Sequence, residues 1–468
     1  MKLSVHEIVE AVNGQLLYGN GEGIITGISI DSRTVKDGEL FIPIIGEKYN
    51  GSHFISHAFQ AGAKAAFITE GCEDAFEDDK YCLIKVEDTL KAFHQLAAYY
   101  LNRFNIPIVA VTGSTGKTST KDMIYAVLSQ KYKVLKNAGN LNNHIGLPIT
   151  VFQLEQGHEA AIFEMGMSSL GEIDRLANIV KPHIGVITNV GLSHIEHLGS
   201  QENIFKAKME IATYMKEKNT LIVNGDDKYL RTLRRTHLDY KIVYAGLEEN
   251  NDLMPLALKD CGEHGTIFQI EEQGKVYDFS LRVPGIHNVY NALCAIVVGK
   301  TLGVEMHLIQ KGLQEFEGSS MRLSITNTKM NVKLINDAYN ASPDSMKAAL
   351  SVLSKINSLR KIAILGDMLE MGEQASPGHY AVGAEAAKYP IDMLIAVGRE
   401  SVNIGRGAIA SGLTQGKVIF CEDNREAITV LDDFLQAGDA VLVKGSRGMK
   451  METICTYIQE RSSMNDTV

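Results

Sequence analysis

A glycine-punctuated turn that ends in lysine and threonine is the strongest chemical signal in the sequence. Residues 106–121 read IPIVAVTGSTGKTSTK, in which an apolar run predicts a buried strand and the pattern from Lys117 onward predicts a helix. Gly113 and Gly116 let the backbone bend so that successive N–H groups point at one anion, which the positive end of the following helix also attracts. The expected phosphate-binding loop comprises Gly113, Ser114, Thr115, Gly116, Lys117, Thr118 and Ser119.

Two side chains of this loop have the chemistry of phosphoryl transfer. Lys117 would reach the β- and γ-phosphates of ATP, and the hydroxyl of Thr118 would bind a magnesium ion. The loop is the shorter T-G-x-x-G-K-T-[ST] form, because Val111 stands where the commoner motif has glycine. An ordinary glycine-rich turn is the competing interpretation, but Gly-Lys-Thr between a strand and a helix favours ATP binding.

Other candidate residues stand where predicted strands end. Apolar runs separated by helix-length spacers predict a mostly parallel sheet with helices on both faces, whose active-site loops lie beyond the carboxyl ends of the strands. Glu164 ends one strand, where a carboxylate either binds magnesium or caps the next helix. His194 lies in the loop NVGLSHIEHLGS, where it is either a metal ligand or a polar residue with its hydrogen bonds satisfied. The spacing of His194, Glu196 and His197 does not match a zinc site. The strands are expected at 108–111, 133–135, 160–165, 184–189 and 220–224.

The chain of 468 residues is long enough for roughly three domains of about 150 residues each. Residues 1–103 read as a small α/β domain, and residues 104–320 contain the ATP-binding unit. Short alternating strands between 240 and 285 predict a small antiparallel insertion. Residues 321–468 restart the alternation with five apolar strands, which predicts a Rossmann-like, doubly wound domain. Linkers near residues 103 and 320 are the expected hinges.

Two groups of polar residues have both a plain and a functional interpretation. Asp31, Ser32 and Arg33 fit a turn with a local ion pair. Asn288 and Asn291 stand at the start of a helical pattern, where asparagine usually caps the helix, although a purine contact is the sharper interpretation. In the last domain, polar residues again follow strands at Asp337, Tyr339, Asn340, Asp344, Asp367, Lys444 and Arg447.

Composition excludes several classes of function. A formal net charge of −10 with no basic block argues against binding to nucleic acid or to an anionic membrane surface. The six cysteines are scattered without metal-ligand spacing, which suits reduced thiols. The N-terminus has an amphipathic helix pattern instead of a signal peptide, and no run approaches the ~18 apolar residues of a membrane span. We expect a cytoplasmic, monomeric enzyme without membrane insertion.

A set of motifs resembles the Mur ligases of peptidoglycan synthesis, in the same order and over essentially the whole chain. The motifs are TGSTGKTST, FEMGM, NVGLSHIEHLGS, AKMEI, GIHNVYNA, MRL, DAYNASPDSM, LGDMLEMG and KGSRGMKME. Within the family, GNLNNHIGLP, DAYNASPDSM and LGDMLEMG resemble the members that add D-alanyl-D-alanine. The Asn-Pro-Arg signature of the members that add the third residue is absent. Folylpolyglutamate synthases share the central fold without the N-terminal module.

The resemblance implies an ATP-dependent amide ligase of cell-wall precursor synthesis. The γ-phosphoryl group of ATP would pass to the terminal carboxylate of UDP-N-acetylmuramoyl-tripeptide, whose third residue is either diaminopimelate or lysine. The amine of D-alanyl-D-alanine would then attack the acyl phosphate, giving the amide, ADP and phosphate. The alternatives are an amide ligase with a different amine substrate and a nucleotide-binding protein without catalysis. The presence of all the candidate metal ligands counts against the second alternative.

The resemblance also implies roles for residues that spacing alone leaves open. Lys208 matches a family lysine that is carbamylated and bridges magnesium ions, with Lys206 as its rival. Without the resemblance, Lys208 would be a solvated helix lysine. His194 matches a second metal ligand, and Thr118 and Glu164 match the first metal site.

The remaining implied contacts are those of the nucleotide and the substrates. Asn288 and Asn291 match the adenine contact, and Arg322 and Asp337 match the phosphate and ribose edge. The implied substrate contacts are Asp31, Ser32 and Arg33 for the uridine nucleotide, Asn142, Asn143 and His144 along the muramyl-peptide channel, and Asn340 and Asp344 in the dipeptide-binding last domain.

Overall fold

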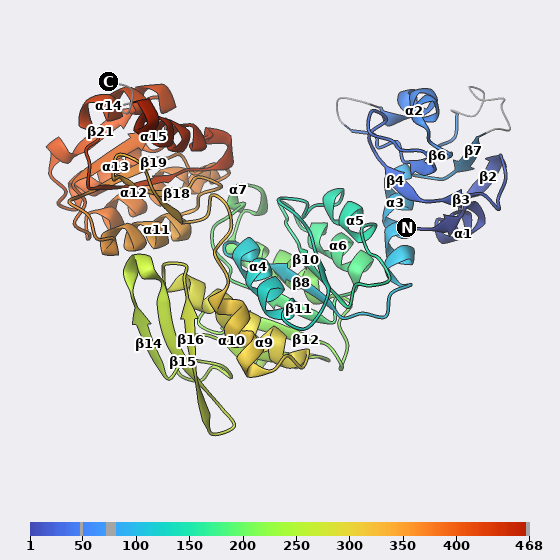
Figure 1. The fold of residues 1–468 in the computed structure, drawn as a ribbon, viewed down its shortest axis with the longest axis horizontal. Helices are drawn as coiled ribbons and strands as arrows, with labels where there is room; N and C mark the ends of the chain where they lie inside the picture. Colours follow the sequence, from blue (N-terminus) through green and yellow to red (C-terminus); the bar gives the residue numbers. More distant parts are fainter. Residues whose placement is uncertain (47–49, 72–80, 465–468) are drawn as a thin grey trace.

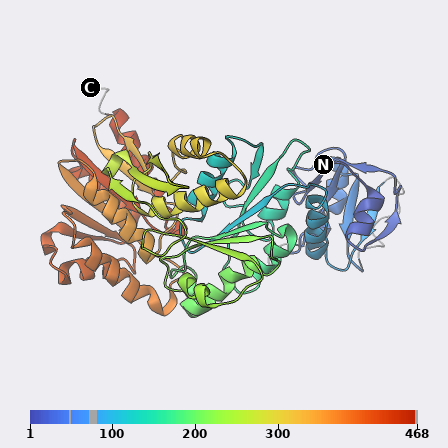
Figure 2. The same cartoon turned by 90° about the horizontal axis from the view of Figure 1, so that it is seen from below.

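The computed structural model describes residues 1–46, 50–71 and 81–464, which form three α/β domains in a row. The N-terminal domain is blue, the central domain runs from teal to yellow, and the C-terminal domain is orange to red (Figure 1). A view from below keeps the same order (Figure 2). The predicted three-domain α/β fold is therefore confirmed. Cys72 lies outside the described residues, and the other five cysteines are free thiols.

The N-terminal domain is built on a five-stranded sheet of order β2-β7-β6-β5-β4. Neighbouring strands are parallel except at β2, which pairs with β7 in the antiparallel sense. The strands are β2 (Gln15–Tyr18), β4 (Gly27–Ser29), β5 (Glu39–Phe41), β6 (Ala65–Ile68) and β7 (Cys82–Lys85). A ribbon of β1 (Leu3–Ser4) and β3 (Ile24–Ile25), with helices α1 (Val5–Ala11) and α2 (Ile55–Ala61), completes the domain.

Helix α3 (Thr89–Leu101) joins the N-terminal domain to the central domain and packs on both. Its buried residues belong to a hydrophobic cluster that runs from α1 to helices α5 (Gly146–Val151) and α6 (Glu172–Val180). The Tyr100 hydroxyl donates a hydrogen bond across the junction to the carbonyl of Leu154 at 2.8 Å. The first two domains therefore share one core.

The central domain contains a six-stranded, all-parallel sheet of order β13-β12-β11-β8-β10-β9. The strands are β8 (Ile108–Thr112), β9 (Val134–Lys136), β10 (Ala160–Glu164), β11 (Ile184–Ile187), β12 (Thr220–Asn224) and β13 (Lys241–Ala245). The segment of β13 was predicted to belong to the antiparallel insertion, and that prediction is wrong. As an edge strand it is buried only at its end, so its alternating pattern looks like that of an antiparallel strand. The insertion consists of β14 (Ala257–Asp260), β15 (Thr266–Glu272) and β16 (Lys275–Leu281).

Helices cover both faces of the central sheet. Helices α4 (Lys117–Leu128), α9 (His287–Thr301) and α10 (Met306–Gln314) pack together with the insertion in one hydrophobic cluster. Helices α5, α6 and α8 (Gln201–Met209) lie on the other face, in the cluster that continues into the N-terminal domain. The loops that follow the carboxyl ends of β8, β10 and β11 therefore lie at the edge of the sheet between the two helical layers.

The C-terminal domain has a six-stranded sheet of order β17-β18-β22-β19-β20-β21. Five parallel strands match the prediction, and β17 (Ser324–Asn327) adds an antiparallel edge strand that its polar sequence did not reveal. The parallel strands are β18 (Lys333–Asp337), β19 (Arg360–Gly366), β20 (Met393–Val397), β21 (Val418–Cys421) and β22 (Asp439–Lys444). The helices are α11 (Pro343–Lys355), α12 (Ala375–Ala386) and α13 (Val402–Ala410) on one face, and α14 (Asn424–Phe434) and α15 (Glu452–Met464) on the other.

The central and C-terminal domains meet through polar pairs and one short helix. Lys333 Nζ lies 2.6 Å from Glu263 Oε2, and Lys355 Nζ lies 2.5 Å from Asp260 Oδ2. Helix α7 (Ile195–Leu198) packs against the 3-10 turn η6 (Gly372–Gln374) of the C-terminal domain. None of the helices in the described ranges is both long and apolar enough to cross a membrane.

Candidate active site

The predicted phosphate loop joins β8 to α4, and its glycines are required by its geometry. Gly113 has φ +151°, and an added Cβ would lie 1.8 Å from the hydroxyl oxygen of Thr188. Gly116 is the N-cap of α4 with φ +78°, a left-handed conformation that favours glycine. The first N–H groups of α4 have no partner within the helix, so they are available to an anion at this turn.

Asn189, which sequence reasoning missed, holds the loop in place from the loop that follows the neighbouring strand β11. Its Oδ1 accepts from the backbone N–H of Thr115 at 2.9 Å, and its carbonyl accepts from the N–H of Ser114 at 3.1 Å. The Ser114 hydroxyl in turn accepts from the N–H of Gly191 at 2.9 Å. Because two loop N–H groups are already used, the donors free for phosphate begin at Gly116.

Lys117 folds back over the loop in this structure. Its Nζ donates to the carbonyl of Gly113 at 2.7 Å. Burial lowers the pKa of Lys117, and the carboxylate of Glu164 opposes that shift. The ammonium is thus held close to the turn where a phosphate chain would lie.

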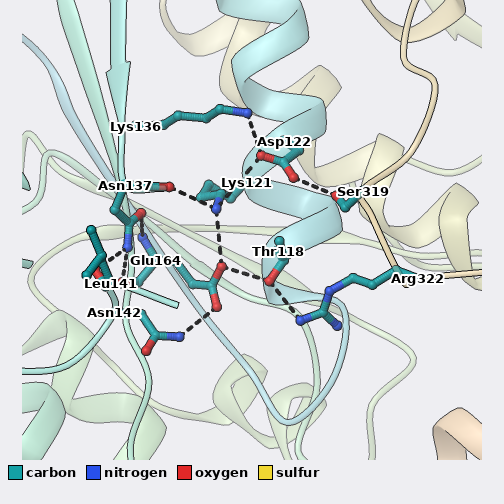
Figure 3. Close-up of polar contacts among 10 residues, drawn as sticks. All are labelled: Thr118, Lys121, Asp122, Lys136, Asn137, Leu141, Asn142, Glu164, Ser319 and Arg322. Atoms are coloured by element: carbon teal, nitrogen blue, oxygen red, sulfur yellow. Dashed lines mark hydrogen bonds and ion pairs between the residues drawn. The ribbon is translucent and has the colours of Figure 1, made fainter. Parts of the chain in front are cut away.

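Glu164, at the end of β10, is the centre of a buried polar cluster (Figure 3). Its Oε2 accepts from the hydroxyl of Thr118 at 2.9 Å, and its Oε1 accepts from Asn142 Nδ2 at 2.9 Å. Lys121 Nζ lies 3.5 Å from Oε2, and both side chains are almost fully buried. Lys121 therefore balances the charge of Glu164 from the second turn of α4. The carboxylate does not cap a helix, so that interpretation of Glu164 is wrong.

Asn137 fixes the same region from the end of β9. Its Oδ1 accepts from the N–H of Glu164 at 2.9 Å, and its Nδ2 donates to the carbonyls of Leu141 and Glu164 at 2.8 and 3.2 Å. The carbonyl of Asn137 accepts from Lys121 Nζ at 3.0 Å. The backbone and the side chain of Glu164 are both held, and neither Asn137 nor Lys121 was predicted.

Two contacts connect this cluster to the segment that leads into the C-terminal domain, also drawn in Figure 3. Arg322 Nη2 donates to the Thr118 hydroxyl at 3.0 Å, while its guanidinium stacks on the ring of Tyr339 at 4.2 Å. The Ser319 hydroxyl donates to Asp122 Oδ2 at 2.5 Å. The interdomain segment thus touches the candidate magnesium ligand directly.

His194 also bonds across the domain boundary. It precedes α7 with φ +64°, and its Nδ1 lies 2.5 Å from Oε2 of Glu370 in the C-terminal domain. Burial and the charge of Lys117 lower the pKa of His194, while Glu370 opposes them. The imidazole lines the same cavity as Lys117.

Lys208 is buried on α8, whereas Lys206 is exposed on the same helix. The side chain of Lys206 is 59% exposed and pairs with Glu202 at 3.0 Å. Lys208 is 1% exposed, and burial lowers its pKa well below the usual value, with a further contribution from Lys117 and opposition from Asp227. The interpretation of Lys208 as a solvated lysine is therefore wrong.

The asparagines at the start of α9 do not cap the helix. The N-cap is Ile286, without a side-chain cap. Asn288 Nδ2 donates to the carbonyl of Pro284 at 2.8 Å, and Asn291 joins Asn288 Oδ1 to the hydroxyl of Thr120. Both are buried and line the cavity, as does His287, whose pKa is lowered to about 4 by burial.

In the C-terminal domain, Asp337 and Lys444 form a buried pair at the ends of adjacent strands. Their Nζ and Oδ2 atoms are 2.5 Å apart, and Lys444 also donates to the carbonyl of Asn340 at 2.9 Å. Burial raises the pKa of Asp344 in the first turn of α11. An added Cβ on Gly191 would lie 2.7 Å from Asp344 Oδ2, so this carboxyl group reaches the phosphate-loop side of the interface.

A cavity of about 610 Å³ lies between the central and C-terminal domains and brings most of the predicted residues together. Gly113, Thr118 and Lys208 are not among its lining residues, although Gly113 accepts from Lys117, Thr118 bonds to Glu164 and Lys208 interacts with Lys117. The predicted residues that line the cavity are Ser114, Thr115, Gly116, Lys117, Ser119, Asn142, Asn143, Glu164, His194, Asn288, Asn291, Arg322, Asp337, Asn340 and Asp344.

Four predicted substrate residues, Asp31, Ser32, Arg33 and His144, lie away from this cavity. Ser32 and Arg33 belong to the N-terminal domain, where Arg33 pairs with Asp31 at 2.6 Å and holds the pKa of that carboxyl at about 2. The local ion pair of the plain interpretation is therefore present. His144 lies at the junction of the first two domains, where its carbonyl is 2.6 Å from Nε2 of His94.

The oxygen atoms of the side chains beside the phosphate loop fit a magnesium ion that takes most of its ligands from the substrate. Within the three described ranges, no group of three or more His, Cys, Asp or Glu side chains is gathered as a cation site. Magnesium in phosphate chemistry commonly takes only one or two carboxylates, with phosphate and water oxygens completing its shell. The hydroxyl of Thr118 and the carboxylate of Glu164 supply such a minimal set beside the phosphate loop.

Comparison with known proteins gives one consistent result. The Mur ligase family catalytic domain matches residues 24–101, the Mur ligase middle domain matches 111–299, and the Mur ligase glutamate ligase domain matches 321–447. A UDP-N-acetylmuramoyl-tripeptide--D-alanyl-D-alanine ligase of Bacillus subtilis is 38% identical over 97% of this chain and 98% of its own length.

Solved structures agree over nearly the full length. A crystal structure of MurF from Acinetobacter baumannii has a TM-score of 0.89 at 29% identity, covering 98% of this chain and 99% of its own. The crystal structure of MurF ligase from Thermotoga maritima in complex with ADP has a TM-score of 0.83 at 27% identity, covering 94% and 98%.

Proposed function

Because the chain belongs to the Mur ligase family, we propose that it joins D-alanyl-D-alanine to UDP-N-acetylmuramoyl-tripeptide at the expense of ATP. The observation that carries the proposal is full-length similarity to ligases named for this reaction, combined with one cavity that unites the phosphate loop and the C-terminal domain. The reaction makes an amide from a carboxylate and an amine, with release of ADP and phosphate. It belongs to the synthesis of peptidoglycan precursors.

ATP binds with its phosphates at the start of α4 and its base near the start of α9. The N–H groups from Gly116 onward and the ammonium of Lys117 bind the phosphate chain. Asn288 and Asn291 are buried and lie close to the start of α4, since the Thr120 hydroxyl donates to Asn291. Their side-chain amides suit the hydrogen-bonding edge of a purine. Arg322, already bonded to Thr118, meets the phosphates from the C-terminal side.

Magnesium would be held by Thr118 and Glu164 at a first site and by His194 and Lys208 at a second. When bound, it neutralises charge on the phosphates and on the transferring group. Lys208 suits carbamylation, because burial lowers the pKa of its amine and so favours the neutral form, which attacks CO2 and then loses a proton. The product is an anionic oxygen ligand in place of a repelling cation. His194 acts as a ligand in this scheme and not as a general base.

Carboxylates are poor electrophiles, so the tripeptide carboxylate first accepts the γ-phosphoryl group. Lys117 stabilises the charge that develops during this transfer. The amine of D-alanyl-D-alanine then attacks the acyl phosphate, and phosphate leaves from the tetrahedral intermediate. Asn340 and Asp344 reach the cavity from the C-terminal domain and contact the dipeptide. Contact between the two domains excludes water, which would hydrolyse the acyl phosphate.

The tripeptide nucleotide extends from this cavity toward the N-terminal domain. Asn142 and Asn143 lie along its path, and His144 lies at the junction that leads to the uridine site of Ser32 and Arg33. The ATP requirement and the five free cysteines among the described residues support a cytoplasmic location.

The first test measures ADP release by the purified protein with ATP, magnesium and combinations of the other substrates. We expect turnover only when UDP-N-acetylmuramoyl-tripeptide and D-alanyl-D-alanine are both present. ADP formation that requires a single amino acid instead of the dipeptide would replace this function with that of a different amide ligase.

A matched pair of substitutions on α8 tests the carbamate. Lys208→Ala should abolish ligation, whereas Lys206→Ala, which removes an exposed lysine two residues away, should leave it nearly unchanged. Mass spectrometry under bicarbonate should find an added CO2 on Lys208 in the native protein. If Lys206→Ala is the inactive variant, the assignment moves to that residue.

A further inference from the structure

The pair of His194 and Glu370 joins two domains at the edge of the active site. Nδ1 of His194, in the loop after β11, lies 2.5 Å from Oε2 of Glu370, in the loop after β19. The N–H of Glu196 also donates to the carbonyl of Glu370 at 3.3 Å. Glu370 therefore contacts the histidine loop through both its side chain and its backbone. In Figure 1, α7, which directly follows His194, lies next to the C-terminal domain.

Both members of the pair have backbone conformations that are unusual for residues with a side chain. His194 has φ +64° and Glu370 has φ +60°. A left-handed conformation is unfavourable for a residue that has a Cβ atom. Such conformations persist where surrounding contacts fix them, and they cluster at functional sites. The geometry of both residues is therefore specified by their loops.

The loop that carries Glu370 is itself held rigidly within the C-terminal domain. Met368 N–H donates to Nε2 of the buried His379 at 2.9 Å, and the Nδ1 of His379 is 2.7 Å from the carbonyl of Ala375. Leu369 N–H donates to the hydroxyl of Ser446 at 2.9 Å. These hydrogen bonds hold the loop so that Glu370 faces the central domain.

The contact determines which nitrogen of His194 carries the proton. A carboxylate oxygen only accepts, so Nδ1 must donate, and in the neutral ring this leaves the lone pair of Nε2 free. Histidines that bind metals almost always donate their other N–H to such a partner, which fixes both the tautomer and the orientation of the ring. The ring that carries the unprotonated Nε2 lines the cavity, because His194 is one of the cavity's lining residues.

We propose that Glu370 is a positioning residue that prepares His194 as a magnesium ligand from the C-terminal domain. The inference rests on the proposed role of His194 in binding magnesium. Because Glu370 belongs to the domain that binds the amine substrate, the histidine is fully prepared only when that domain contacts the central domain. The contact thus links assembly of the second metal site to docking of the domain that protects the acyl phosphate from water.

The first experiment reads the histidine directly, without metal. Protein labelled with ¹⁵N-histidine is compared as wild type, Glu370→Ala and Glu370→Gln, with His194→Gln used to assign the signals. We expect Nδ1 of His194 to be protonated in the wild type and a shift toward the Nε2-protonated form in Glu370→Ala. Glu370→Gln keeps an acceptor and should keep more of the wild-type signal. Glu373→Gln removes an exposed carboxylate from the same segment and serves as the matched control.

The second experiment measures Mn²⁺ affinity by electron paramagnetic resonance in the presence of ADP. Outer partners of metal-binding histidines commonly contribute 10- to 100-fold to affinity, so Glu370→Ala should weaken Mn²⁺ binding about 10-fold and Glu373→Gln should not. If His194→Gln weakens binding but Glu370→Ala changes neither affinity nor tautomer, the role of Glu370 is refuted and the proposed metal site stands. If His194→Gln itself leaves Mn²⁺ affinity unchanged, the proposed metal site fails, and the role of Glu370 fails with it.

Discussion

The buried pair of Lys121 and Glu164 should have a measurable coupling energy within the central domain. Nζ and Oε2 are 3.5 Å apart, and the side chains are 2% and 3% exposed. Two charges about 4 Å apart interact by about 4 kcal/mol at an effective dielectric constant near 20. Lys121 is also 3.8 Å from Asp122, and Thr118 and Asn142 donate to Glu164, so part of each charge is compensated elsewhere. We therefore expect a coupling of about 2 kcal/mol.

A double-mutant cycle with Lys121→Met and Glu164→Gln measures this coupling. Hydrogen exchange of the β10 amides reports the local opening free energy, which avoids treating a three-domain chain as two-state. Each single variant should lose protection, since it leaves a buried charge without its partner. The opening free energy of the double variant should fall by about 2 kcal/mol less than the sum of the two single-variant losses. At 1.4 kcal/mol per tenfold change, this difference corresponds to roughly 30-fold in exchange rate.

The matched control is Lys136→Met, which removes a lysine that pairs with Asp122 at 2.7 Å instead of with Glu164. Because Lys136 reaches Glu164 only through Asp122 and Lys121, its coupling with Glu164→Gln should be weaker, at about 0.5 kcal/mol. A coupling of that small size for Lys121 and Glu164 would refute the view that Lys121 balances the carboxylate.

Three further predictions test the phosphate loop, the cavity histidine and the thiols. Gly113→Ala should lower the melting temperature and abolish ADP binding by calorimetry because its Cβ has no space, whereas Gly171→Ala, also at positive φ but in open space, should retain binding. The folded-state pKa of His287 is about 4, below its ordinary value of 6.5, so the unfolded chain binds the proton more tightly than the folded chain does. The free energy of unfolding should therefore fall as the pH drops from 6.5 toward 4. His287→Gln should flatten this fall in a plot of melting temperature against pH. Native alkylation followed by mass spectrometry should modify the partly exposed Cys261 and spare the buried Cys294, whose pKa burial raises to about 12, until the protein unfolds.

The elements that sequence reasoning predicted are those whose signals are local. The parallel strands of both large sheets are short continuous apolar runs, because helices bury both of their faces. Strands β13 and β17 escaped correct assignment because each is an edge strand with incomplete burial. Composition cannot distinguish such a strand from a piece of an antiparallel ribbon or a loop.

The candidate site divides in the same way. The phosphate loop has its glycines, lysine and threonine within a few adjacent positions, so its chemistry is visible in the sequence. Asn189 and Glu370 act on residues 74 and 176 positions away, and no spacing rule connects such pairs. Lys121 was missed for a different reason, since a lysine in a helix is usually solvated and only the fold buries this one.

The continuous core between the first two domains determines how this enzyme could be recombined with its relatives. A cut near residue 103 would separate α3 from helices α5 and α6 and expose apolar residues such as Phe93 and Leu96. A cut near residue 320 crosses an interface with several polar pairs, such as Lys333 with Glu263. For the design of chimeras the chain is therefore two modules and not three. Under the proposed function, in which the C-terminal domain binds the amine, we expect exchange of this module to change the amine that is added and to leave the nucleotide-sugar substrate the same.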